Sequence, residues 1–164
     1  MRVLLDTNIL LDVLLERAPF VSDSSAIWAA CDQGQLVGFI PASTLTDIFS
    51  IARRATERAT ARVAVGLCLA AFDICPVDRT TIEQATALPG NDFEDNLQLA
   101  CAMIAGLDVV VTRNDRDFSD SSIPILTLAA LLARLSSSRT RFRSERLGAH
   151  AVRRMPCRPM MCPL

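Results

Sequence analysis

Six aspartates lie where predicted strands end or where the following helices begin: Asp6, Asp47, Asp92, Asp95, Asp115 and Asp117. In a parallel sheet such strand ends lie along one edge, so we expect these carboxylates to share a site. Gathered carboxylates repel one another unless cations neutralise them, and Mg²⁺ and Mn²⁺ prefer oxygen ligands. Two such ions roughly 3.5–4 Å apart can activate a water and stabilise the leaving oxygen of a phosphodiester.

Each aspartate also has a purely structural interpretation. Asp6 could cap the next helix, and Asp95 could be a first-turn acid that favours the helix dipole. Asp47 could be a solvated helix residue, while Asp115 and Asp117 could form a turn. Because these acids recur at related places in the predicted architecture, their joint placement favours one shared site.

The sequence alternates strand and helix patterns around these positions. Predicted strands cover residues 2–6, 36–40, 72–75, 109–111 and 125–126. Helical patterns begin near residues 8, 22, 43, 56, 80, 91 and 127. Gly34 and Gly106 are predicted to end two of these helices. Because wholly apolar strands are typical of a sheet covered on both faces, we predict an α/β fold with a central parallel sheet of about five strands.

Charge divides the chain into two parts. Residues 1–136 carry 10 arginines against 17 acidic residues, whereas residues 137–164 carry seven arginines against Glu145 alone. We therefore predict a folded acidic domain over 1–136 and a basic, disordered tail over 137–164. The acidic domain disfavours tight nonspecific binding of nucleic acid through bulk charge, and it fits a site that holds divalent cations.

Composition argues against several other classes of protein. The 164 residues are 51% hydrophobic and 21% charged, which fits a soluble globular protein. The longest apolar run, residues 64–72, is too short to span a bilayer, and no secretory signal follows Met1, so we expect a cytoplasmic protein. The six cysteines form no CxxC pattern and His150 is the only histidine. Buried free thiols are therefore favoured over a zinc site or a Cys/His nucleophile.

Three segments together resemble a known family. LLDTNILLD at residues 4–12, DFEDNLQLACA at residues 92–102 and VVVTRNDRDF at residues 109–118 look like the motifs of a PIN-domain protein. The resemblance covers about residues 2–135 and is greatest to the VapC-like toxin ribonucleases, in the subgroup with a DFED…TRN…DF pattern. It implies a PIN-like three-layer α/β/α fold and metal-dependent cleavage of RNA.

The resemblance also implies roles for individual acids. Asp6 matches the first metal-binding aspartate of the family, and Asp95 matches the third, with Asp92 as a supporting ligand. Asp47 matches the second acidic position, where relatives often have Glu. Its shorter side chain would shift a metal or leave a water between.

The fourth metal-binding position has three candidates. Alignment from Thr112 places it on Asn114, whose neutral oxygen would bind a cation more weakly. Alignment backwards from Phe118 places it on Asp115 or Asp117.

Supporting roles follow from the same resemblance. Thr7, Asn8 and Thr112 are expected to orient the metal ligands or the substrate, as groups beside metal sites commonly do. Arg113 and Arg116 lie beside the predicted site and are suited to bind phosphates.

The main hypothesis is therefore a Mg²⁺- or Mn²⁺-dependent endoribonuclease in which Asp6, Asp47, Asp95 and Asp115 are catalytic. The family implies RNA as substrate, an antitoxin protein as partner and a homodimer. One alternative is a catalytically weak PIN module that binds RNA or protein. A phosphoryl-transfer domain is disfavoured, because the chain has no lysine and position 8 holds Asn where such a site needs a second acid.

Overall fold

The structure is a computed structural model that describes residues 1–118 and 121–137. The chain divides into two units, Met1–Leu132 and Ala133–Leu164, and the first contains the sheet and the candidate site described below. A helix begins at residue 128 and is described as far as residue 137. The basic tail was predicted to begin at residue 137, but residue 137 still belongs to this helix, and residues 138–164 lie outside the described residues.

Five parallel strands form one sheet in the order β3-β2-β1-β4-β5. The strands are β1 (Arg2–Leu5), β2 (Val37–Pro41), β3 (Asp73–Cys75), β4 (Val109–Thr112) and β5 (Ile125–Thr127). The central strand β1 pairs Leu4 with Phe39 of β2 on one side and with Val110 of β4 on the other. The predicted parallel sheet of about five strands is confirmed.

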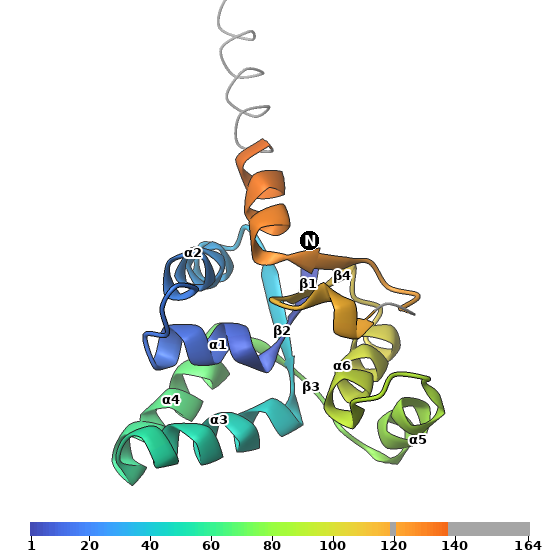
Figure 1. Cartoon of the computed structure of the whole chain (residues 1–164), viewed down its shortest axis with the longest axis horizontal. Helices are drawn as coiled ribbons and strands as arrows, with labels where there is room; N and C mark the ends of the chain where they lie inside the picture. Colours follow the sequence, from blue (N-terminus) through green and yellow to red (C-terminus); the bar gives the residue numbers. More distant parts are fainter. Residues whose placement is uncertain (119–120, 138–164) are drawn as a thin grey trace, which may run out of the picture. The chain divides into compact units, whose positions relative to one another are not determined.

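Six helices of the first unit flank the sheet in two groups. They are α1 (Thr7–Leu14), α2 (Val21–Asp32), α3 (Ala42–Ala55), α4 (Arg58–Ala71), α5 (Arg79–Ala87) and α6 (Phe93–Ile104), and a 3₁₀ turn, η1 (Asp115–Phe118), follows β4. Helices α1 to α4 contact one another, while α5 packs on α6. The strands lie between these groups in Figure 1, which gives the expected α/β/α layers.

Local sequence explains where the helices around the sheet begin and end. Asp6 caps α1 and Asp92 caps α6, because each side chain accepts a hydrogen bond from a backbone N–H of the first turn. Gly34 and Gly106 follow α2 and α6 with φ of 69° and 59°, the left-handed conformation that glycine adopts most easily. Both predicted helix ends are confirmed.

The hydrophobic core fixes the strands that carry the candidate site. Leu4 of β1 and Val110 of β4 are fully buried and pack in one cluster with Leu99 of α6 and with Phe118. Burial of each such side chain contributes about 1.5–3 kcal/mol. The cluster thereby holds β1 and β4 against α6. No helix among the described residues is long and apolar enough to cross a membrane.

Candidate active site

Asp6 lies directly after β1 and is 6% exposed. Its Oδ2 accepts a hydrogen bond of 2.8 Å from Thr112 Oγ1, at the end of β4. Its Oδ1 accepts bonds from the backbone N–H of Asn8 at 3.2 Å and from Gln98 Nε2 at 3.4 Å. Asp6 is therefore both a helix cap and a carboxylate held in one orientation by residues of α1, α6 and β4.

The first turn of α6 supplies three more acids. Asp92 Oδ1 accepts the backbone N–H of Glu94 at 2.7 Å and that of Asp95 at 3.4 Å. Acids are favourable here because the helix N-terminus carries a partial positive charge. The DFED segment therefore forms a helix start with its carboxylates gathered at one end.

These groups surround one pocket, which we call the acidic pocket. It has a volume of about 240 Å³ and lies at the carboxyl ends of β1 and β4. Its lining is formed by Asp6, Asn8, Asp92, Glu94, Asp95, Gln98, Thr112, Arg113 and Asn114. The fold thus brings Asp6 together with Asp92 and Asp95, about 90 residues later in the chain, at the sheet edge where ligands bind in open α/β folds.

Glu94 lines the acidic pocket although the sequence patterns did not single it out. Its Oε1 accepts a hydrogen bond of 3.1 Å from Thr7 Oγ1, which lies 3.2 Å from Thr44 Oγ1 on α3. Partial burial raises the pKa of Glu94, the bond from Thr7 opposes this rise, and the charges of Asp47, Asp6 and Asp92 add to it. A fourth carboxylate therefore faces the same group of acids.

Asp47 lies in the second turn of α3, outside the residues that line the acidic pocket. It is half-buried, and burial raises its pKa. Its charge acts on Glu94, so the two carboxylates lie close enough to interact. The fold therefore does not place Asp47 among the lining residues of the acidic pocket, although its charge is felt by Glu94.

The candidates for the fourth position differ in where they lie. Asn114 lines the acidic pocket, and its backbone N–H donates to Thr112 Oγ1 at 3.1 Å. Asp115 begins η1, is exposed and is not among the lining residues. The side chain of Asp117 lies outside the described part of the chain.

Arg113 brings a positive charge to the acidic pocket. Its Nη1 donates to Asp12 Oδ1 at 3.0 Å, and Asp12 is fully buried in α1. Arg116, the other predicted phosphate-binding residue, is exposed on η1. Asp12 was not predicted as a site residue, although an acid within the apolar run ILLDVLL is a signal for a buried partner of opposite charge.

The donor set of the acidic pocket suits a hard divalent cation. Its carboxylates and amides offer oxygen, the ligand that Mg²⁺ and Mn²⁺ prefer. Gln98 Oε1 is buried and has no hydrogen-bond partner among the described residues. The Nε2 of the same amide donates to Asp6. A cation or its bound water would satisfy this oxygen. Within the described residues, no three His, Cys, Asp or Glu side chains are already arranged to hold a metal, so the fit rests on donor chemistry.

The described cysteines are free and buried, as expected: Cys31, Cys68, Cys75 and Cys101. Burial raises the pKa of Cys31 to about 11 and that of Cys68 and Cys101 to about 12. These thiols stay protonated near neutral pH and are poor nucleophiles, because the thiolate is the reactive form.

A model of the PIN domain matches residues 2–116, and the chain therefore belongs to the PIN-domain family. The resemblance seen in the three sequence motifs is confirmed at this level. The narrower DFED…TRN…DF subgroup stays a prediction.

Solved structures share the fold. One similar chain comes from a toxin–antitoxin complex of Klebsiella pneumoniae and is 24% identical to this chain, with a TM-score of 0.57. The match covers 77% of this chain and 97% of the Klebsiella chain. A chain of DNA-bound VapBC from Salmonella typhimurium is 17% identical, with a TM-score of 0.58, and the match covers 78% of this chain and 98% of the Salmonella chain. Mycobacterium tuberculosis VapC20, described as a toxin that cleaves the sarcin–ricin loop, is 14% identical, with a TM-score of 0.58 over 70% and 92%. Comparison with curated proteins gives no significant match.

Proposed function

We propose that this PIN-domain protein is a Mg²⁺- or Mn²⁺-dependent endoribonuclease and the toxin of a type II toxin–antitoxin pair. The main support is the acidic pocket, in which four carboxylates and one guanidinium lie at the carboxyl ends of β1 and β4. This combination suits a substrate that carries phosphates and reacts with the help of cations. The toxin assignment rests on the VapC and toxin–antitoxin structures that share the fold.

Asp6, Asp92 and Asp95 would hold the metal, with Asp47 completing the set from α3. We keep Asn114, Asp115 and Asp117 as candidates for the fourth position. When bound, such a cation lowers the pKa of a coordinated water and stabilises charge on the phosphate. Glu94 lies among these acids and is a further candidate ligand.

The chain's own residues supply orientation and charge. Thr112 and Gln98 fix the Asp6 carboxylate, and Thr7 fixes that of Glu94. Arg113 lines the same pocket, and its guanidinium is suited to bind a phosphate oxygen. Because the four described cysteines are buried, we expect hydrolysis by water without a covalent intermediate on the protein.

Cleavage of RNA by the purified protein tests this function. We expect the wild type to cut members of a panel of single-stranded and structured RNAs only when Mg²⁺ or Mn²⁺ is added. Asp6→Asn should lower the rate by at least about 100-fold, since a neutral amide replaces a charged ligand. Cleavage that is equal in both proteins, or that persists in excess chelator, would refute the proposal.

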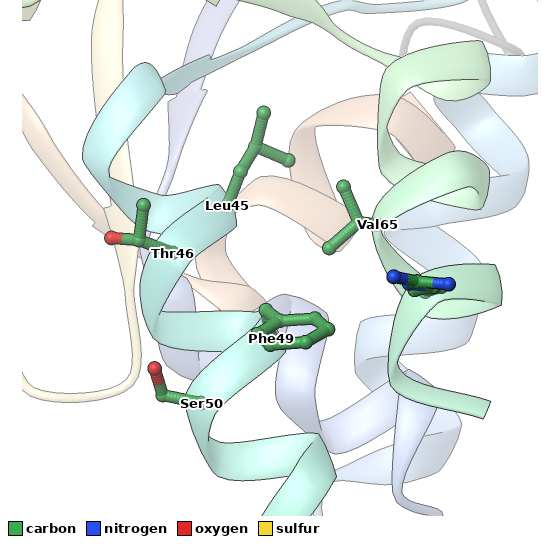
Figure 2. Close-up of a pocket in the computed structure, with 6 residues that line it drawn as sticks. Leu45, Thr46, Phe49, Ser50 and Val65 are labelled. Atoms are coloured by element: carbon green, nitrogen blue, oxygen red, sulfur yellow. The ribbon is translucent and has the colours of Figure 1, made fainter. Parts of the chain in front are cut away.

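The antitoxin and a second copy of the chain are the proposed protein partners. Apolar surface suited to a partner helix is present on α3 and α4, where a groove of about 380 Å³ lies between the helices. In Figure 2, Leu45 and Phe49 of α3 point toward Val65 of α4 across this groove. Light scattering of the chain alone and with the product of a neighbouring gene measures both associations. A strict monomer in both samples would contradict them.

A further inference from the structure

Arg113 lines the acidic pocket, and two other residues contact its guanidinium. Its Nη1 donates to Asp12 Oδ1 at 3.0 Å, and its Cζ lies 4.5 Å from the centre of the Phe20 ring. Asp12 is itself fixed, because Ser24 Oγ donates to its other oxygen at 3.3 Å. We call Asp12, Phe20 and Ser24 the arginine bracket.

The residues of the arginine bracket lie on one side of the sheet, and the acids of α6 lie on the other. Asp12 lies in α1 and Ser24 in α2, both fully buried, while Phe20 precedes α2 and is 41% exposed. Arg113 follows β4 and keeps a quarter of its side chain exposed. The guanidinium is therefore anchored in the protein, while Arg113 lines the acidic pocket and keeps part of its side chain exposed.

A buried ion pair is a poor way to gain stability, because desolvation offsets much of the attraction between the charges. It is a good way to fix a cation in one position. A guanidinium has five N–H donors in a planar fork, and Asp12 accepts a hydrogen bond from Nη1 of that fork. The remaining donors suit a phosphate, and a pre-positioned group loses less entropy on binding.

The charge of the acidic pocket favours such a cation for binding a phosphate. A polyanionic backbone is repelled by the carboxylates, and Arg113 is the one basic residue among the nine that line the pocket in the described chain. We propose that the arginine bracket holds Arg113 as the binding group for one backbone phosphate of RNA, and that Asp12 is the positioning residue. This inference rests on the proposed ribonuclease function and adds to it the residues that position Arg113 for phosphate binding.

Binding of a fluorescent single-stranded RNA at several salt concentrations tests the proposal. The measurements use the Asp6→Asn background, so that the RNA stays intact. Arg113→Met should weaken binding about tenfold and reduce the slope of log affinity against log salt by about 0.7, the value for one phosphate contact. Arg79→Met is the matched control, since Arg79 is exposed on α5 and pairs only with Glu83 among the described residues.

The bracket itself is tested by substitutions that leave Arg113 in place. Asp12→Asn and Phe20→Leu should each weaken binding a few-fold with the salt slope unchanged, because the charge remains but is less well positioned. With Asp6 restored, the same variants should raise KM a few-fold and change kcat less than twofold. Arg113→Lys should fall between wild type and Arg113→Met. Phe20 is partly exposed, so Phe20→Leu remains informative if a substitution at Asp12 prevents folding.

The outcomes separate the two proposals. Unchanged affinity and salt slope in folded Arg113→Met would overturn the phosphate site even if Asp6→Asn abolishes cleavage. If both Asp12→Asn and Phe20→Leu have the KM of the wild type, the bracket is only a structural ion pair and its proposed positioning role is overturned. If Arg113→Met loses RNA binding but the wild type cleaves no RNA, the phosphate site stands and the ribonuclease function fails.

Discussion

The carboxylate of Asp6 receives hydrogen bonds from three different elements. The backbone of Asn8 comes from α1, Gln98 from α6 and Thr112 from β4. A carboxylate held in this way has one orientation in which a lone pair can face a cation, which is the role of supporting groups in metal sites. Asp6 can therefore cap α1 and contribute to the acidic pocket at the same time.

Gln98→Leu removes one of these donors at nearly constant volume. We expect it to lower Mn²⁺ affinity and RNA cleavage by about 10- to 100-fold, the range seen when supporting residues of metal sites are replaced. Gln84→Leu on α5 is the control, because Gln84 contacts Met103 and not the acidic pocket. Calorimetric titration with Mn²⁺ measures the effect. Equal affinity in both variants would show that Gln98 does not support the site.

The raised pKa values of the acids predict how stability depends on pH. Partial burial raises the pKa of Glu94 above its ordinary value of 4.5, and burial also raises those of Asp47 and Asp12. At pH values between the ordinary pKa and the raised pKa of such a group, the folded chain binds more protons than the unfolded chain. Stability contributed by these groups is therefore present at low pH and lost as pH rises.

Glu94→Gln isolates one of these contributions. The melting temperature of the metal-free wild type should fall relative to that of Glu94→Gln as pH rises from about 4.5 to 7. Added Mn²⁺ should reduce the difference, since it neutralises the carboxylates. Glu83→Gln provides the control, as Glu83 is exposed on α5. A gap between wild type and Glu94→Gln that does not change with pH would contradict the prediction.

At the scale of elements, the start of α6 combines folding with function. Asp92 accepts two backbone N–H groups and also lines the acidic pocket. Asp92→Ala should cost about 1 kcal/mol in the free energy of unfolding, whereas Asp92→Asn should cost only a few tenths, because Asn caps helices about as well as Asp. Urea unfolding measures this difference.

Metal binding, in contrast to stability, should not distinguish these two variants. Both lack the carboxylate, so both should bind Mn²⁺ more weakly than the wild type and to a similar extent. Full Mn²⁺ affinity in Asp92→Asn would limit Asp92 to its role as a helix cap.

The order of the elements was predictable because apolar runs such as Val109–Thr112 leave few alternatives to a buried parallel strand. The same topology brings Asp6 and Asp95 to one pocket, as the positions of their strand and helix suggest. The rotation of α6 about its axis was not predictable, since packing against the sheet sets it. Glu94 was therefore missed as a pocket residue, and Gln98 reads in the sequence only as a polar residue within the apolar run LQLACA.

Contacts across the chain explain the other differences. Arg113 and Asp12 are 101 residues apart, and no local pattern links them. Asp115 looked equivalent to Asn114 in the sequence, but the chain turns into η1 at this point and leaves Asp115 exposed. Site residues fixed by backbone topology were thus easier to predict than those fixed by side-chain packing.

At the scale of the whole molecule, residues 1–136 carry more acids than arginines, and several of these acids converge on one pocket. Such a concentration of charge lowers the stability of the metal-free protein and favours binding of cations, because each bound ion relieves repulsion among the carboxylates. Under the proposed function, an RNA substrate would reach the pocket together with cations and with the help of Arg113.

Calorimetric titration of the wild type, Asp6→Asn and Asp95→Asn with Mn²⁺ tests most directly whether acids from distant parts of the chain bind cations together. We predict saturable binding by the wild type and at least about tenfold weaker binding by each variant, since each removes one charged ligand from the same site. A wild type that binds no Mn²⁺ at millimolar concentrations would contradict the account, and so would variants that retain wild-type affinity.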